Sequence, residues 1–174
     1  MLLGHSYLPD AFKTADHEAV WSQVGDAIAS LEAFSPHVFL NSGTLLGAVR
    51  DGKLIDHDDD VDLAVLIDAQ NEEEAGRVWR RMCEEMAAQG MLDSSKERDM
   101  AQVQLKTGGQ TTIDVFPGWI DRGRVYVYPH TYGTLDEADL LPLGTCRITG
   151  LKIPAHPEKM LAVNYGDGWQ KPDP

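Results

Sequence analysis

The stretch from Asn41 to Val65, NSGTLLGAVRDGKLIDHDDDVDLAV, constrains the fold of this chain more than any other. It combines a glycine-containing turn, a short apolar run and an acidic cluster that passes directly into an apolar segment. Four aspartates lie within five residues there: Asp58, Asp59, Asp60 and Asp62. The four carboxylates should repel one another by Coulomb's law, so placing them together at the start of an apolar strand is locally unfavourable. Unfavourable local arrangements of this kind tend to occur where function requires them. A hard divalent cation is the expected compensation, because Mg²⁺ is held by one or two carboxylates together with substrate phosphates.

The acidic cluster stands at the head of a segment that is expected to form a strand, Asp60 to Ile67. Side chains alternate between the two faces of a strand, so Asp60 and Asp62 share one face. Val61 and Leu63 then face the core. The sequence therefore predicts two carboxylates that point the same way from the start of a buried strand.

A lone carboxylate is expected on a later strand, Thr111 to Phe116, which reads TTIDVF. An alternating segment, Ala101–Lys106, and a hairpin turn, Thr107–Gln110, precede it, and Pro117-Gly118 is expected to break it. Its one charge, Asp114, is costly in an apolar strand unless it is paired or bound to a metal. A salt bridge to an arginine or lysine would explain Asp114 taken alone. With an acidic strand upstream, a shared metal is the better explanation.

The other segments predict helices and short strands around these two. A helix is expected from Thr14 or Asp16 to about Phe34, then a strand over Val38–Leu40. The Asn41–Thr44 turn is expected to lead into a short helix from Leu45 to Arg50. Later expectations are a helix over Asn71–Gly90, a polar loop over 91–99, a strand over Arg124–Tyr128, loop and short turns over 129–147, a strand or ribbon over Ile148–Ile153 and a helix from His156 to about Tyr165. The pattern indicates an α/β (α+β) fold, and a single domain over residues 1–174 is expected because no repeat or linker interrupts it.

Charge and composition exclude several classes of function. The net charge of −13, from 15 Lys+Arg against 28 Asp+Glu, argues against a nucleic-acid partner and against anionic membrane surfaces. No apolar run approaches the about 20 residues needed to span a bilayer, and the start, MLLGHSYLPDAF, lacks the basic region of a signal peptide. Two cysteines, Cys83 and Cys146, form neither a disulfide framework nor a metal-ligand spacing. Reduced thiols in a cytoplasmic protein are therefore expected.

The three strand carboxylates suggest a specific chemistry. Asp60, Asp62 and Asp114 belong to two predicted strands and can together hold one or two Mg²⁺ ions. Such ions orient the phosphates of a nucleotide, neutralise charge on the leaving group and position an attacking hydroxyl. Phosphoryl transfer depends on this positioning and electrostatics more than on covalent help from the protein.

Three motifs in the chain resemble a known family. Gly43-Thr44, Asp60-Val61-Asp62 and Ile113-Asp114-Val115 together resemble the nucleotidyltransferase-fold pattern. More narrowly, the segments SGTLLGAVRDGKLIDHDDDVDLAV, IDVFP and NYGDGW are similar to the LicD/fukutin family, over about residues 38–170. The resemblance implies a mixed β-sheet flanked by helices and a metal triad at Asp60, Asp62 and Asp114, with Mg²⁺ as the cofactor and Mn²⁺ as a possible substitute.

The same resemblance implies an activity. Members of this family move a phospho-alcohol group, such as phosphocholine or ribitol phosphate, from a CDP-linked donor onto a glycan. The chain departs from the family pattern in two ways, and the second bears on the identity of the acceptor. His57 stands where the family often has tryptophan, and the region between Phe116 and Ile148, where the acceptor would be recognised, is short.

Further residues around the acidic stretch are candidates for substrate contacts. Ser42, Gly43 and Thr44 would provide backbone and hydroxyl donors to the donor phosphates, because a helix N-terminus favours an anion. Arg50 and Lys53 could neutralise a diphosphate, or they could simply pair with Asp51 or Asp58.

Other candidates lie beside the triad in sequence or near the C-terminus. Asp58 or Asp59 could orient the triad, bind a second metal or act as the base towards an acceptor hydroxyl. Tyr165 and Trp169 could close the site, or they could pack in the core. An aromatic box for a quaternary ammonium group is also conceivable, from Trp119, Tyr126 and Tyr128, although such a run is usually an ordinary strand.

Three functions remain open from the sequence. The leading interpretation is a Mg²⁺-dependent phosphotransferase that uses a CDP-alcohol or other nucleotide donor and a glycan-type or small-molecule acceptor. The first alternative is a nucleotidyltransferase that moves NMP from an NTP to a small molecule, which would release pyrophosphate rather than CMP. The second is a non-catalytic nucleotide-sensing module, which the intact aspartate triad disfavours because a sensor could dispense with one carboxylate.

Overall fold

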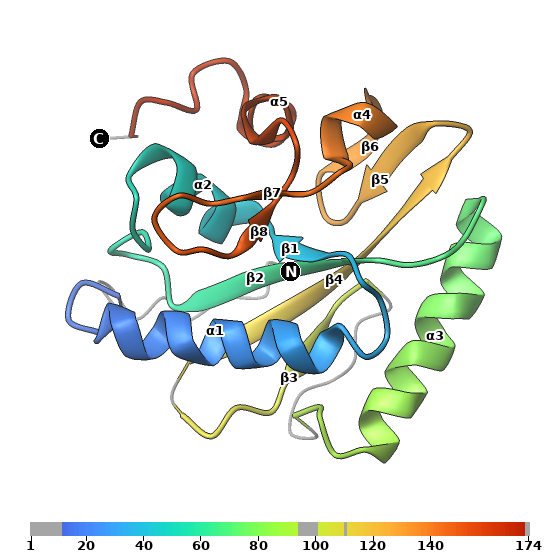
Figure 1. The fold of residues 1–174 in the computed structure, drawn as a ribbon, viewed down its shortest axis with the longest axis horizontal. Coiled ribbons are helices and arrows are strands. Elements are labelled where there is room, and N and C mark those ends of the chain that lie inside the picture. The colour runs from blue at the N-terminus through green and yellow to red at the C-terminus, as the bar shows by residue number, and fades with distance from the viewer. Residues whose placement is uncertain (1–11, 94–100, 110, 173–174) are drawn as a thin grey trace, which may run out of the picture.

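The architecture comes from a computed structural model, which describes residues 12–93, 101–109 and 111–172. Within these ranges the helices and strands follow in the order α1 (His17–Leu31), β1 (Val38–Leu40), α2 (Ser42–Arg50), β2 (Asp60–Leu66), α3 (Glu72–Ala88), β3 (Val103–Leu105), β4 (Thr112–Asp121), β5 (Arg124–Val127), β6 (Thr131–Asp136), α4 (Glu137–Leu140), β7 (Gly144–Thr145), β8 (Lys152–Ile153) and α5 (Pro157–Tyr165) (Figure 1).

A six-stranded mixed sheet forms the centre of the fold, in the order β1-β2-β4-β5-β6, with β3 also paired to β4. β2 and β4 are parallel, and the chain passes through α3 and β3 between them. The pairs of β1 with β2, β3 with β4, β4 with β5 and β5 with β6 are antiparallel. β7 and β8 form a separate two-stranded ribbon. The expected mixed sheet flanked by helices is therefore confirmed.

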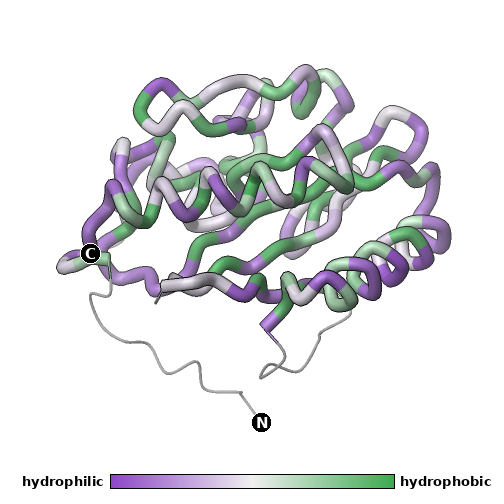
Figure 2. The backbone as a smooth tube through the Cα atoms, turned by 60° about the horizontal axis from the view of Figure 1, so that its bottom comes forward, coloured by the Kyte–Doolittle hydropathy of each residue, from purple (hydrophilic) through white to green (hydrophobic). Residues whose placement is uncertain are grey.

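Helix α1 forms because its sequence provides both a cap and an apolar stripe. The Asp16 side chain accepts hydrogen bonds from the amides of Glu18 and Ala19, which have no partner within the helix. Four residues at helical spacing are buried: Val20, Val24, Ile28 and Leu31. Figure 2 shows apolar segments concentrated in the interior strands, whereas the helices alternate between hydrophilic and hydrophobic residues. Helices α1 and α3 thus bury one face against the core and present the other to solvent.

Two sequence expectations for the strand and helix boundaries near the site are wrong. Helix α2 begins at Ser42 rather than Leu45, because the Asn41 carbonyl already accepts the Leu45 amide at 2.9 Å. Strand β4 continues through Pro117-Gly118 to Asp121. The carbonyls of these two residues maintain the pairing, since they accept the amides of Tyr128 and Ile67 at 3.1 and 2.8 Å. The amide that proline lacks is therefore not needed at this position.

The region 129–147 is also more regular than expected. It contains β6, α4 and β7 instead of loop and short turns. β6 pairs with β5, and the ion pair of Arg124 with Asp136, at 2.9 Å, joins the ends of these strands. The ribbon expected over Ile148–Ile153 is confirmed only in its last two residues, as β8. The polar loop expected over 91–99 lies mostly outside the described residues, as does Gln110 of the hairpin turn.

Both cysteines are buried and neither forms a disulfide, in line with the expectation of reduced thiols. Across the part of the chain that the structure describes, no helix combines the length and apolarity that crossing a bilayer requires.

Candidate metal-binding site

The carboxylates of Asp60, Asp62 and Asp114 meet on one face of the sheet. β2 and β4 are paired with Asp62 directly opposite Asp114 and Asp60 opposite Thr112. Because both strands alternate in the same register, the three carboxylates project from the same face. One oxygen from each lies within 4.8 Å of the others. Asp114 is buried, and Asp60 and Asp62 are partly buried. The structure thus brings together the three residues that the sequence suggested as a triad.

Burial and mutual repulsion raise the pKa values of the carboxyl groups in this cluster. Burial, followed by the charges of Asp114 and its other acidic neighbours, raises the pKa of Asp60 from 3.8 to about 6. Burial and then the charge of Asp60 raise the pKa of Asp62 well above its ordinary value, although a hydrogen bond from the Gly43 backbone opposes this. A bound cation would reverse the effect, because an opposite charge favours the ionised form of a carboxyl group. Three hard oxygen donors at this spacing fit Mg²⁺ or Mn²⁺.

A fourth carboxylate, Asp58, lies against the start of α2. A Cβ added to Gly43 would lie 2.8 Å from the Asp58 Oδ2 and 3.8 Å from the Asp62 Oδ2. The backbone at Gly43 therefore lies close to the Asp58 carboxylate, which would have to shift to admit a side chain there. Burial raises the pKa of Asp58, while the charges of His57 and Arg50 lower it. Asp58 thus adjoins the triad. Asp59 adds its charge to Asp58 and Asp60, although the structure assigns it no contact in the cluster.

The turn between β1 and α2 carries an unusual polar group. Ser42 has a positive φ of 43°, which non-glycine residues seldom adopt, and its buried Oγ has no hydrogen-bond partner among the described residues. Next to it, the Thr44 hydroxyl accepts the amide of Asp62 at 2.9 Å. The backbone amide of Asn41 donates to the backbone carbonyl of Asp62 at 3.0 Å. These contacts fix the N-terminus of α2 to β2.

Asp114 receives hydrogen bonds from two glutamines that sequence reasoning missed. The Gln104 Nε2 donates to Asp114 Oδ1 at 3.0 Å, and the Gln102 Nε2 donates to Asp114 Oδ2 at 3.1 Å. These two donors are neutral amides. Alternation in the segment 101–106 places both glutamines on one face, and this pattern is the signal that could have identified them.

The two basic residues near the cluster both have acidic partners. Arg50 contacts Asp51 through Nε and Nη2, at 2.9 and 2.7 Å, which is one of the pairings expected from the sequence. Its charge also lowers the pKa of Asp58 and of Tyr165, so it lies near the edge of the cluster. Lys53 instead pairs with Asp56, at 2.7 Å and with both side chains exposed to solvent.

Of the two aromatic residues expected at the site, one lies near the triad. Tyr165 ends α5, and burial together with the negative charges of Asp62 and Asp58 raises its pKa. It therefore lies on the same side of the protein as the carboxylates. Trp169 is partly buried and packs against the hydrophobic core.

The possible aromatic box is filled by its own rings. Trp119 stacks on Tyr126 with centroids 5.2 Å apart and planes inclined by 7°, and it lies 6.0 Å from Tyr128 in a tilted arrangement. Tyr128 in turn meets the Tyr132 ring edge-on at 5.7 Å. Trp119 is only 4% exposed. These rings pack on one another rather than around an open space, as in an ordinary strand pair.

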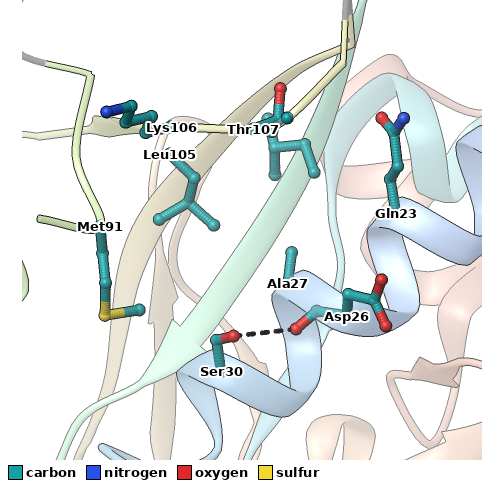
Figure 3. Close-up of a pocket in the computed structure, with 10 residues that line it drawn as sticks. Gln23, Asp26, Ala27, Ser30, Met91, Leu105, Lys106 and Thr107 are labelled. Atoms are coloured by element: carbon teal, nitrogen blue, oxygen red, sulfur yellow. Dashed lines mark hydrogen bonds between the residues drawn. The ribbon is translucent and has the colours of Figure 1, made fainter.

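A separate hollow of about 220 Å³ lies between α1 and the β3 region (Figure 3). It is lined by polar and apolar side chains, among them Gln23, Asp26, Leu105 and Ile113. Ile113 precedes Asp114 in β4, so its side chain projects to the opposite face of the sheet. The hollow therefore lies on the other side of the sheet from the acidic cluster.

Comparison with known families adds an independent observation. A family model described as LicD/FKTN/FKRP, nucleotidyltransferase domain, matches residues 36–157. That interval holds the Ser42–Thr44 turn and the three clustered carboxylates, whereas Tyr165 and Trp169 lie beyond it. A search of curated proteins found no match.

Proposed function

Because this chain belongs to the LicD/FKTN/FKRP family of nucleotidyltransferase domains, we propose that it is a Mg²⁺-dependent phosphotransferase with a CDP-alcohol donor and a glycan-type acceptor. Family membership suggests transferase activity of the phosphotransferase type on glycans. The single observation that supports metal dependence is the convergence of three carboxylates within 4.8 Å on one face of the sheet. Crowded carboxylates with raised pKa values are expected where a cation normally shares the site.

Asp60, Asp62 and Asp114 would hold the ion. When bound, Mg²⁺ would neutralise the diphosphate of the donor and the charge that develops on the departing CMP. The remaining contacts come from the chain itself. The Ser42 hydroxyl and the backbone of Ser42 to Thr44 would bind phosphate oxygens at the N-terminus of α2.

The reaction would then be a single displacement at phosphorus. The acceptor hydroxyl oxygen forms a bond to the phosphorus that carries the alcohol, and the bond from that phosphorus to the CMP oxygen breaks. Asp58, beside the triad, would take the proton from the acceptor hydroxyl. Arg50 would add positive charge at the edge of the site, and Tyr165 would cover it from α5. Lys53 would contribute only after leaving its exposed partner Asp56, so we assign it a lesser role in binding the diphosphate.

We place this activity in the cytoplasm, in agreement with two buried cysteines that form no disulfide. The proposal is tested by incubating the protein with Mg²⁺ and CDP-choline, CDP-ribitol or CDP-glycerol, with a panel of oligosaccharide acceptors. Acceptor-dependent CMP release that requires the divalent cation is the expected result. Pyrophosphate release from an NTP without CMP release would instead identify a nucleotidyltransferase. Saturable nucleotide binding without turnover on any acceptor would identify a sensor.

A further inference from the structure

Two glutamines, Gln104 in β3 and Gln102 immediately before it, donate hydrogen bonds to the two carboxylate oxygens of Asp114. Gln104 lies directly opposite Asp114 in the antiparallel pairing of β3 with β4. Gln102 is two residues earlier and therefore projects from the same face. Each donates from Nε2 to a different oxygen, at 3.0 and 3.1 Å. Between and beyond them, Val103 and Leu105 are buried in the core on the other face.

We propose that Gln102 and Gln104 are positioning residues that set the orientation of the Asp114 carboxylate towards the bound cation. A carboxylate held at one oxygen can still rotate about its Cβ–Cγ bond, whereas one held at both oxygens cannot do so without losing a hydrogen bond. Each carboxylate oxygen has two acceptor positions, so each can accept an amide hydrogen and still face a metal ion. Hydrogen bonds to ligating carboxylates are a general means of orienting metal ligands.

The neutrality of these donors matters for the charge of the site. An arginine or lysine in the place of either glutamine would also orient Asp114, but its positive charge would compete with the cation. An amide donates the same kind of hydrogen bond and leaves the carboxylate charge in place. The glutamine pair therefore orients Asp114 while the cluster keeps its attraction for a divalent ion. This inference rests on the proposed metal-dependent function, which it deepens.

The test is the affinity of the protein for Mn²⁺ alone, measured by the electron paramagnetic resonance signal of the free ion, without nucleotide. The variants are Gln102→Met, Gln104→Met and the double variant, because methionine keeps the length of the side chain without its amide. Loss of an outer hydrogen-bond partner typically lowers metal affinity by about 10–100-fold, and we expect the double variant to fall in that range. The matched control is Gln70→Met, an exposed glutamine beyond the far end of β2, which should bind Mn²⁺ like the parent.

Thermal unfolding in chelator separates positioning from a structural role. If the glutamines only support the fold, the metal-free melting temperature falls while the folded variants bind Mn²⁺ as tightly as the parent, and the inference is overturned. If the double variant does not fold, the single variants are measured, and each should show part of the loss. Because Mn²⁺ binding needs no turnover, its result does not depend on whether the protein releases CMP from a CDP-linked donor. Absence of CMP release with glutamine-dependent Mn²⁺ binding would refute the proposed reaction and keep the positioning role.

Discussion

Removing one carboxylate of the triad should make the metal-free protein more stable. Burial and neighbouring negative charges raise the pKa of Asp60 from 3.8 to about 6, so at pH 7 its ionised form is disfavoured in the folded state. At about 1.4 kcal/mol per pKa unit, the full shift corresponds to about 3 kcal/mol. Since Asp60 is partly exposed, solvent screening reduces this to about 1–2 kcal/mol. Asp60→Asn should recover that amount without removing a packed group.

The measurement is thermal unfolding of the parent and Asp60→Asn in chelator at pH 7. For a chain of 174 residues, a gain of 1–2 kcal/mol corresponds to a rise in Tm of about 2–8 °C. The exposed residue Asp68 provides a control, because Asp68→Asn should change the Tm little. A Tm for Asp60→Asn at or below that of the parent would refute the claim that this cluster is electrostatically strained.

The pH dependence and the metal dependence have defined signs. A carboxyl group whose pKa is raised in the folded state binds a proton more tightly there than in the unfolded chain. Metal-free stability of the parent should therefore fall as the pH rises from about 4 to 6, and the advantage of Asp60→Asn should nearly vanish at pH 4. Mg²⁺ at 100 times its Kd would stabilise the parent by about 2.7 kcal/mol. The order of the two Tm values should then reverse, since the variant has lost a ligand.

Three further predictions concern the turn before α2 and the triad. Ser42→Ala should leave the free energy of unfolding within about 0.5 kcal/mol of that of the parent, because its Oγ has no partner to lose, but should raise KM for the CDP-linked donor. An unchanged KM would exclude the proposed phosphate contact. Gly43→Ala should reduce turnover, because the new Cβ would lie 2.8 Å from the Asp58 Oδ2 and would displace that carboxylate. Alanine itself favours the helix by about 1 kcal/mol, so the fold should be retained. Full activity would show that the close approach of the backbone to Asp58 is not needed. Asp114→Asn should abolish turnover while its circular dichroism spectrum stays that of the parent, and near-parental activity would exclude it from the triad.

The acidic site could be predicted because its signals are local and strong. Carboxylates are unfavourable in apolar strands unless they are paired or bound to a metal. The aspartates at the start of β2 and the lone Asp114 in β4 are therefore conspicuous in the sequence. The period of two in each strand then decides which face every carboxylate takes. The sequence led us to expect the three carboxylates together, and the parallel pairing of β2 with β4, which it did not predict, brings Asp62 opposite Asp114.

The parts that were missed depend on contacts between distant segments. Gln104 in the short strand β3 and Gln102 just before it are neutral residues, and only the three-dimensional structure shows that both donate to Asp114. Strand β6 follows a register shift between Val125 and Tyr126, which interrupts the alternation that a sequence pattern needs. Pro117 lies inside β4, where its carbonyl accepts the amide of Tyr128, just beyond the end of β5, and no local rule anticipates this contact.

The most direct test of the central claim is a crystal of this protein soaked with Mn²⁺ and a cytidine diphosphate ligand, measured at a wavelength where manganese scatters anomalously. We expect an anomalous peak for a manganese ion coordinated by oxygens of Asp60, Asp62 and Asp114. The diphosphate should lie between this ion and the N-terminus of α2. A manganese peak elsewhere with an empty triad, or a nucleotide bound away from the three carboxylates, would contradict the account.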